Sequence, residues 1–401
     1  IARPGPMKAL QDVRVLELGQ LLAGPFASSL LASYGAEVIK VEPPGSGDPM
    51  RGWRMRHEGT SLWWYSIARN KKSVTLDLRD ARAPALIKRL VAECDVLIEN
   101  FRPGRMEEWG LGYEELSRIR PDLIMVRISG WGQDGPYAQR PGFASVAEGV
   151  GGLRHLIGDP DRPPVRTGVS LGDTLAGLHA VIGALMALHH REKTGRGQVV
   201  DTAIYESVFQ MLESVLPEYD FFGHVRERTG AKLAGIVPTN TYVCKDGKFI
   251  IIGGNGDSIF QRLMRAAGRP DLALDARLAD NPGRVQHEAE IDAAIGAFTA
   301  QHDYEAVLEL LQKADVPAGP IYSIADIARD PQYAARKMFE SVSLPDGKPL
   351  KIPAIVPKLS ETPAVTEWPG PSLGQHNREV YGGLLGMTDA EIDALRETKL
   401  I

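Results

Sequence analysis

One aspartate stands out in the segment GVSLGDTLAG, residues 168–177. Asp173 follows a glycine and precedes a long apolar run, LAGLHAVIGALMALHH, in which large aliphatic residues recur at three- and four-residue spacing. That spacing predicts a helix with one buried face. A carboxylate at the start of a helix can accept hydrogen bonds from the first backbone N–H groups, or it can act as a nucleophile. The residues around Asp173 leave both interpretations open.

Most motifs that would identify a reaction are missing from the sequence. No G-x-G-x-x-G follows the first predicted strand, where the turn is GQLLAGP, and there is no Walker A sequence, H-E-x-x-H or G-x-S-x-G. The nine histidines are scattered, so no metal site is predicted. The stretch GGNGDS, residues 253–258, is compatible with a phosphate-binding nest or with a hairpin-to-helix turn. The motifs alone indicate an α/β enzyme without an assigned reaction.

Composition excludes several classes of protein. The chain has 401 residues, 43% of them hydrophobic, which is enough for two domains or for one large domain with an insertion. The formal net charge of −5 argues against a nucleic-acid partner. No run approaches eighteen consecutive apolar residues, so no membrane span is expected. Two widely separated cysteines, Cys94 and Cys244, argue against a disulfide framework and favour a cytoplasmic location. The stretch IARPGP before Met7 is left out of the fold prediction.

Short apolar strands alternate with helical segments in the first half of the chain. The predicted strands are VRVLEL (13–18), AEVIKVE (36–42), SVTLDL (73–78), DVLIEN (95–100) and LIMVRIS (123–129). Helices are predicted around GPFASSLLASYG and residues 83–94, and the helix after Asp173 leads to a further strand in GRGQVVDTAI. This alternation predicts a doubly wound, Rossmann-like α/β domain over residues 7–205.

The pattern changes after about residue 220. Residues 206–230 are predicted as a linker helix, and TNTYVCKDGKFIIIGG is predicted as a hairpin that turns at Lys245–Gly247. Three helices are predicted after it, near residues 257–267, 287–301 and 303–314. Residues 231–325 therefore form a smaller α+β domain. Residues 326–401 are rich in proline and loops, and we expect them to pack along a surface.

Several phrases together resemble one family. They are LAGPFASSLLASYGAEVIKVEPPGSGD (22–48), NKKSVTLDLR (70–79), ENFRPGRMEEWGLGYEEL (99–116), SGWGQDGPYAQRPGF (129–143), GDTLAGLHAVIGALMALHHREKTGRGQVVD (172–201) and VPAGPIYS (316–323). In their order and spacing they resemble the class III coenzyme A transferases, the group that includes formyl-CoA, carnitine and succinyl-CoA transferases. The resemblance runs from about residue 8 to the C-terminus.

The resemblance implies that Asp173 is the catalytic nucleophile. Its carboxylate would attack a thioester carbonyl and expel CoA thiolate, giving an acyl–aspartyl anhydride that the thiolate converts to an aspartyl-CoA thioester. An acceptor acid would then repeat these steps in reverse. This chemistry requires neither ATP nor a metal nor a permanently bound cofactor, since the coenzyme A thioester is the substrate. Water must be excluded, and the helix N-terminus would keep the carboxylate ionised.

The family pattern also implies positions that contact CoA. They are Leu22, Ala23, Leu76, Arg79, Asn100, Phe101, Arg105 and Ile204. Arg79 and Arg105 are the candidates for binding the CoA phosphates, and the alternative for each is a solvated surface charge. For Leu76 and Ile204 the alternative is an ordinary core position.

Departures from the family pattern narrow the choice of reaction. The α-methylacyl-CoA racemases also resemble this chain, but they pair the aspartate with a histidine at the position of Phe143, which cannot transfer a proton. Formyl-CoA:oxalate members carry a glutamate at the position of Ala144 and a Gly-rich loop where this chain has only Gly230 and Gly235. We expect Phe143, Arg140 and Gly235 to contact the acyl group or the acceptor acid.

The sequence thus predicts a CoA transferase that uses succinyl-CoA or another dicarboxylyl-CoA and a small carboxylic acid. The alternatives are an acyl-CoA racemase or isomerase and a CoA-binding protein without catalytic activity. The resemblance further implies an interlocked homodimer, in which each chain forms a ring that the other threads. In such a dimer, residues 326–401 return to the large domain.

Overall fold

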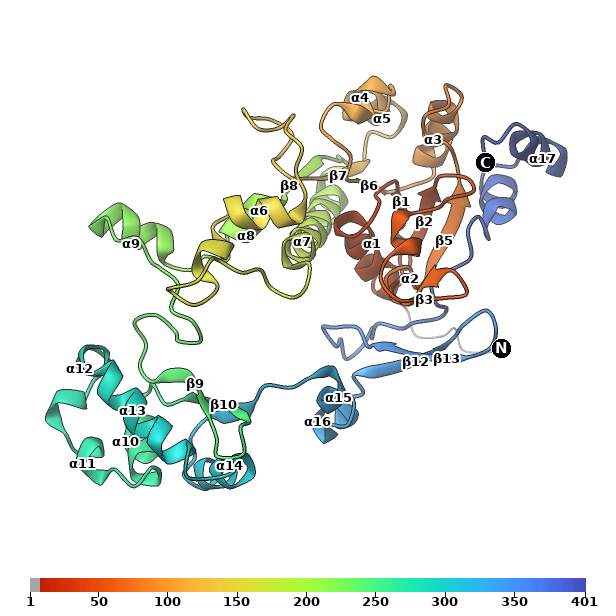
Figure 1. The fold of residues 1–401 in the computed structure, drawn as a ribbon. Helices are drawn as coiled ribbons and strands as arrows, with labels where there is room; N and C mark the ends of the chain where they lie inside the picture. The colour runs from red at the N-terminus through yellow and green to blue at the C-terminus, as the bar shows by residue number, and fades with distance from the viewer. Residues whose placement is uncertain (1–7) are drawn as a thin grey trace. The chain divides into compact units, whose positions relative to one another are not determined.

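A computed structural model describes residues 8–401 of the chain (Figure 1). The first seven residues, including the IARPGP stretch and the start of the predicted large domain, lie outside the described residues. The chain divides into two compact units, which are described separately below. The first unit consists of residues up to Leu153, Thr167–Asp220 and Ala334–Ile401, and the second of Arg154–Arg166 and Phe221–Tyr333.

The first unit is built on a parallel sheet of six strands in the order β5-β2-β1-β6-β7-β8. The strands are β1 (Arg14–Glu17), β2 (Glu37–Glu42), β5 (Lys71–Thr75), β6 (Val96–Glu99), β7 (Ile124–Ser129) and β8 (Val199–Ala203). Alternate residues of a strand face opposite sides, and here both sides are buried: Val15 joins one core cluster and Leu16 the other. The predicted α/β fold with a central parallel sheet is therefore confirmed.

Helices cover both faces of this sheet (Figure 1). The face of Val15 is covered by α1 (Ala23–Ser33), α6 (Ala144–Val150), α7 (Leu171–Thr194) and α8 (Ile204–Phe209). The face of Leu16 is covered by α3 (Ala83–Ala92), α4 (Arg105–Glu108), α5 (Tyr113–Ile119), the π-helix η4 (Arg378–Leu384) and α17 (Asp389–Glu397). Cys94 is fully buried in the second of these clusters, and burial raises the pKa of its thiol to about 12.

Helix α7 bears on the expectation that no segment spans a membrane. By length and composition alone it could cross one, although polar residues interrupt its apolar run. Its inner face carries Ala176, Ala180, Ala184 and Ala187, which are buried against the sheet and α1. Because these side chains are small, the helix backbone approaches the sheet closely.

The segment 206–230, predicted as one helix, instead contains the end of α8 and a separate helix, α9 (Val215–Phe222). Glu213 between them has φ +52°, in the left-handed region that a right-handed helix cannot continue through. Residues 223–230 are not helical, and Gly223 has φ +65°.

The second unit is an antiparallel sheet of three strands packed against helices. The strands are β9 (Thr239–Val243), β10 (Phe249–Gly253) and β11 (Ala318–Pro320), and the main helices are α10 (Asp257–Ala266), α13 (Glu288–Thr299) and α14 (Tyr304–Lys313). Ile250 and Ile252 pack against Phe260 and other helix residues, which explains why one sheet face is buried. The predicted hairpin and its three helices are confirmed to within two residues at each end.

Shorter elements connect these layers. They are η1 (Pro49–Gly52), β3 (Arg56–His57), β4 (Thr60–Ser61), α2 (Leu62–Ile67), η2 (Leu153–Leu156), α11 (Pro270–Ala273), η3 (Ala276–Leu278), α12 (Asn281–Gln286), α15 (Ile324–Ile327), α16 (Pro331–Ala335), β12 (Phe339–Ser343) and β13 (Pro349–Pro353).

The proline-rich C-terminal segment is attached to the first unit by specific hydrogen bonds. The amide of Asn70, at the start of β5, donates to the Val365 carbonyl at 2.6 Å and accepts from the backbone N–H of Glu367 at 2.7 Å. The indole of Trp64 donates to the Pro371 carbonyl at 2.9 Å. These contacts replace the regular sheet pairing that a segment with many prolines cannot make.

Substituting Asn70 should therefore loosen the C-terminal segment. Asn70→Ala removes the amide hydrogen bonds and places alanine at φ +59°, so we expect the free energy of unfolding to fall by about 2–4 kcal/mol in urea denaturation. Asn70→Gly, which tolerates that φ, should cost less than Asn70→Ala. An Asn70→Ala protein as stable as wild type would contradict this account.

Candidate active site

The strand order places a crevice at the carboxyl ends of β1 and β6. From β1 the chain passes to β2 on one side of the sheet, whereas β6 lies on the other side, so β1 and β6 flank the topological switch point. In open α/β sheets ligands bind outside the carboxyl ends of the strands at this point. A pocket of about 300 Å³ lies there, which we call the Phe101 pocket. It is lined by Gln20, Val41, Glu42, Pro43, Ser46, Leu76, Asp77, Leu78, Arg79, Phe101 and Trp109.

A buried charge cluster lies under this edge. The Lys40 ammonium donates to Glu17 Oε1 at 2.7 Å and to the Gly19 carbonyl at 2.8 Å, and it forms an ion pair with Asp48 Oδ2 at 2.8 Å. Lys71 donates to Glu17 Oε2 at 2.8 Å and to the Pro25 carbonyl at 2.7 Å. All four charged side chains are essentially inaccessible to solvent. Two cations and two carboxylates make the cluster neutral, as burial requires.

The pKa values of this cluster follow from burial and pairing. Burial alone would raise the pKa of Glu17, but Lys40 and Lys71 outweigh burial and lower the pKa to about 2. Burial also opposes the charge of Lys40, yet Asp48 and Glu17 hold its pKa above the ordinary value. Burial lowers the pKa of Lys71 to about 8 despite Glu17, so Lys71 is still mostly charged at neutral pH.

The cluster fixes the turn between β1 and α1. Asp48 Oδ1 accepts from the backbone N–H of Leu21 at 3.1 Å and of Met50 at 2.8 Å. The amide of Asn100 accepts from the Gln20 N–H at 2.9 Å and donates to the Gln20 carbonyl at 2.8 Å. Leu21 can therefore be held at φ +63°, which is costly for a leucine. Asn100 was predicted from the family pattern as a CoA contact, which stays a prediction; in the structure its amide holds this turn.

Asp173 is the third residue of α7 and not its N-cap. The N-cap is Ser170, whose side chain makes no capping bond. The N–H of Gly172 instead donates to Oε1 of Glu148, a buried residue of α6, at 3.1 Å. Glu148 and Ile204 pack tightly around Gly172, where both side chains would lie 3.1 Å from an added Cβ and would have to shift slightly. Asp173 therefore does not occupy the N-cap position of its helix, and Ile204 supports the helix start as a core residue.

Helix α7 brings Asp173 to the start of α1. Gly177, one turn after Asp173, packs so closely on α1 that a Cβ would lie 2.8 Å from Phe26 and 3.1 Å from the Ala23 carbonyl oxygen. The N-termini of both helices, which favour negative charge, are therefore close together. A second pocket, of about 270 Å³, lies between them, and we call it the Arg54 pocket. It is lined by Leu22, Arg54, Trp63, Gly168, Val169, Ser170 and Thr174.

The structure brings some of the predicted site residues together and separates others. Leu76, Arg79 and Phe101 line the Phe101 pocket, and Leu22 lines the Arg54 pocket. Ala23, the first residue of α1, is buried. Arg79 is exposed and paired with Asp77 at 2.9 Å, and Arg105 is exposed and paired with Glu108 at 2.7 Å. Their binding to phosphate stays a prediction.

The three predicted acyl or acceptor contacts lie on exposed surface. Phe143 is the N-cap of α6 and is 73% exposed, and the Arg140 guanidinium lies 3.7 Å from the centre of the Tyr137 ring. Gly235 belongs to the second unit and has φ +73°. The roles of all three stay predictions.

The sequence prediction missed Lys40, Asp48, Glu148 and Arg54. Lys40 had a recognisable pattern, since a lysine within the buried strand EVIKVE requires a buried partner. Asp48 and Glu148 contact residues of other elements, so no local sequence pattern predicts their roles.

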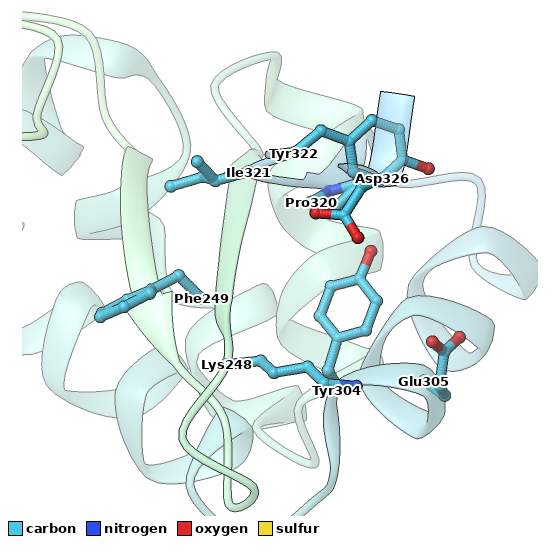
Figure 2. A pocket seen from close by; sticks show the side chains of 8 residues that line it. All are labelled: Lys248, Phe249, Tyr304, Glu305, Pro320, Ile321, Tyr322 and Asp326. Carbon is cyan, nitrogen blue, oxygen red and sulfur yellow. The ribbon is translucent and has the colours of Figure 1, made fainter. Parts of the chain in front are cut away.

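The second unit has a pocket of its own, of about 420 Å³ (Figure 2). Phe249, Tyr304 and Tyr322 line it together with Lys248, Glu305, Pro320, Ile321 and Asp326. The Lys248 ammonium lies 5.6 Å from the centre of the Tyr304 ring. The Asp326 carboxylate is engaged in capping α15, where it accepts from Ser323 at 2.5 Å and 2.8 Å.

Within residues 8–401, one group of side chains has the spacing of a metal site: His57, Glu58 and Asp346. The group is only partly buried, and His57 Nε2 is already 2.8 Å from Asp346 Oδ2. Lys348 lies 3.1 Å from the same carboxylate oxygen and competes for it.

The fold is that of an α/β protein with a pocket at the switch point of its parallel sheet. Residues 10–377 match the model of the CoA-transferase family III, and the chain belongs to that family. It is an enzyme of the CoA-transferase class, 2.8.3, as the resemblance implied.

Named relatives and solved structures agree with this assignment. The chain is 51% identical to succinyl-CoA–D-citramalate CoA-transferase of Chloroflexus aurantiacus, over 99% of both chains. It is 35% identical to succinyl-CoA:glutarate CoA-transferase of Mus musculus, over 97% of this chain and 89% of that one. A CAIB/BAIF family protein from Brucella suis superimposes with a TM-score of 0.82 at 36% identity, covering 94% of this chain and 99% of that chain.

The depressed pKa of Glu17 predicts how stability depends on pH. Because its folded pKa of about 2 lies below the ordinary value of 4.5, Glu17 contributes stability above pH 4.5, and the contribution is lost as pH falls toward 2. The stability difference between wild type and Glu17→Gln in urea denaturation should therefore shrink by about 2 kcal/mol from pH 6 to pH 3. Glu309→Gln, which breaks an exposed pair with Lys313, should change stability little at either pH. An unchanged difference for Glu17→Gln would contradict the proposed pairing.

Proposed function

We propose that the enzyme transfers CoA from succinyl-CoA or another dicarboxylyl-CoA to a small carboxylic acid through Asp173. The observation that carries the proposal is the position of Asp173. It lies in the first turn of α7, one turn before Gly177 packs on the start of α1, and the N–H of Gly172 in the same turn donates to Glu148. The relatives described above are named for succinyl-CoA together with citramalate or glutarate, which supports a dicarboxylyl donor.

The chemistry proceeds by exchange between acyl groups. A carboxylate oxygen of Asp173 attacks the thioester carbonyl, the C–S bond breaks and CoA leaves as a thiolate, which produces a mixed anhydride. The thiolate attacks the aspartyl carbonyl, so that the donor acid leaves as a carboxylate and an aspartyl-CoA thioester forms. The acceptor carboxylate attacks this thioester, and the released thiolate then attacks the acceptor's carbonyl in the new anhydride. Asp173 returns to its carboxylate form.

The surroundings of Asp173 suit these steps. The N-termini of α7 and α1 favour the ionised nucleophile and the negative charge that develops on the attacked carbonyl oxygen. Asp173 is half-buried, and nearby Leu22 and Ile204 are almost completely buried, so apolar side chains limit the access of water to an anhydride.

The Phe101 pocket suits the nucleotide part of CoA. Phe101, Trp109 and Leu76 provide an apolar slot for adenine, with the Phe101 and Trp109 rings edge to face at 5.2 Å. Arg79 and Arg105 stand at or near its rim. Their ion pairs with Asp77 and Glu108 are exposed and therefore weak, so a phosphate can displace the carboxylates.

The position of Phe143 argues against the racemase alternative. By the family pattern, Phe143 stands where the racemases carry their second proton-transferring group, and a phenyl ring cannot exchange a proton. A CoA-binding protein without catalytic activity is distinguished from the transferase by turnover. We also propose a cytoplasmic location, supported by two free, buried cysteines.

Replacing the nucleophile should abolish transfer. Asp173→Asn should lower the rate of CoA transfer from succinyl-CoA by at least about a thousandfold, because the amide cannot form the anhydride. Mass spectrometry would follow new acyl-CoA species with a panel of carboxylic acids. The exposed control Asp12→Asn should behave like wild type.

Three other results of this transfer assay would contradict the proposal. Transfer by Asp173→Asn at the wild-type rate would refute the role of Asp173. Intact succinyl-CoA in the wild-type reaction with every acid would refute the donor. If other acyl-CoA donors also failed to exchange, uptake of solvent deuterium at the α-carbon would identify an isomerase instead.

We propose that the enzyme is an interlocked homodimer. Support comes from the outer face of α7, where Leu178, Ile182, Leu185 and Met186 are 41–68% exposed, an apolar surface that a partner would cover. We expect light scattering to give the mass of a dimer even at nanomolar concentration, because threaded chains cannot separate without unfolding. A monomer at that concentration would contradict the interlocked arrangement.

A further inference from the structure

Arg54 is the cationic side chain of the pocket that adjoins the nucleophile. The Arg54 pocket has Leu22 from the β1–α1 turn on one wall, and Ser170 and Thr174 from the start of α7 on another. Thr174 follows Asp173 directly, and Ser170 precedes it by one helical turn. A ligand in this pocket would therefore lie beside the first turn of α7, which carries the nucleophile.

The backbone holds Arg54 in a costly conformation. Arg54 has φ +56°, in the left-handed region that costs a non-glycine residue on the order of 1 kcal/mol or more. The flanking chain is fixed on both sides: the N–H of Trp53 donates to the Met50 carbonyl at 3.1 Å, and the N–H of Leu62 donates to the Met55 carbonyl at 3.0 Å. Strain of this kind persists where the surrounding structure imposes it, and it is concentrated at binding sites.

Arg54 differs from the nearby Arg51 because it makes no ion pair with a carboxylate among the described residues. Arg51, three residues earlier, makes a bidentate pair with Glu42 at 2.7 Å and 2.8 Å. Within residues 8–401, Arg54 has no carboxylate partner, and its guanidinium lies 5.6 Å from the centre of the Trp63 ring. A guanidinium held near an aromatic face with its N–H groups available is suited to binding a carboxylate or a phosphate.

We infer that Arg54 binds the second carboxylate of a short dicarboxylyl group whose other carbonyl reacts at Asp173. The inference rests on the proposed function, and it names the residue that makes a dicarboxylyl group the preferred substrate. The pocket volume of about 270 Å³ lies just below the range for drug-sized ligands, and a four- or five-carbon chain suits it. Arg54 remains bound to the distal carboxylate while the other end reacts, so its contribution is to substrate binding and not to the chemical step.

A guanidinium in this pocket could bind a CoA phosphate instead of the distal carboxylate of the acyl group. A comparison of two acyl-CoA donors distinguishes these two anions. Succinyl-CoA and butyryl-CoA carry the same phosphates and the same number of acyl carbons, but only succinyl-CoA has a distal carboxylate. Loss of a carboxylate contact affects succinyl-CoA alone, whereas loss of a phosphate contact affects both donors equally.

The test measures binding in a background that cannot turn over. Isothermal titration of Asp173→Asn and of the Asp173→Asn/Arg54→Gln double variant would give the affinity for each donor. We expect Arg54→Gln to weaken succinyl-CoA binding by about 10- to 100-fold, the range for a charged hydrogen bond, and to change butyryl-CoA binding by less than about threefold. Arg54→Lys should restore part of the affinity, because an ammonium supplies the charge without the bidentate geometry.

The matched control is Arg56→Gln in the same background. Arg56 is an exposed arginine two residues away on β3 and does not line the Arg54 pocket, so neither affinity should change. Equal weakening of both donors by Arg54→Gln, or weakening of neither, would overturn the inference. These titrations do not depend on turnover, so the role of Arg54 can fail while Asp173 remains the nucleophile, and the reverse.

Discussion

The buried ammonium of Lys40 is the constraint on which the candidate active site depends. A charge at this depth is tolerated only if it is paired, and the three oxygen partners of Lys40 come from the end of β1, the turn after it and the loop before η1. Asp48, one of these partners, holds Leu21 and Met50 with a single oxygen atom. The same cluster therefore positions the turn that carries Leu22 and the segment that leads to Arg54, which form two walls of one pocket.

Small residues on α7 provide the second constraint. Gly177 and the buried alanines allow α7 to cross α1 at close range, so that the two helix N-termini reinforce each other's preference for negative charge. Glu148 of α6 accepts a hydrogen bond from the Gly172 N–H in the first turn of α7 and so joins the two helices. The carboxylate of Asp173, the proposed nucleophile, thereby lies in the first turn of a helix whose N-terminus favours negative charge.

The sequence predicted the elements of the parallel sheet well, because a strand buried on both faces appears as a continuous apolar run. Asp173 was found through its G-D phrase and the resemblance to a family. The sequence could not show that the Asn100 amide hydrogen-bonds to the backbone of Gln20, or that Glu148 accepts from the first turn of α7. Both contacts join segments that are far apart in the chain. The prediction of one linker helix over residues 206–230 was wrong because Glu213 takes a left-handed backbone conformation, which no sequence pattern predicts. Nor does any sequence pattern predict that the backbone of Arg54 lies in the left-handed region.

The most direct test of the central claim is to trap the acylated nucleophile. Wild-type enzyme would be incubated with succinyl-CoA, treated with hydroxylamine and digested, and peptide mass spectrometry would locate the hydroxamate. The account predicts a hydroxamate on Asp173 that forms only when succinyl-CoA is present, because both the anhydride and the aspartyl-CoA thioester react with hydroxylamine at that carbonyl. A hydroxamate on another carboxylate such as Glu148, or none while CoA transfer proceeds, would contradict the account.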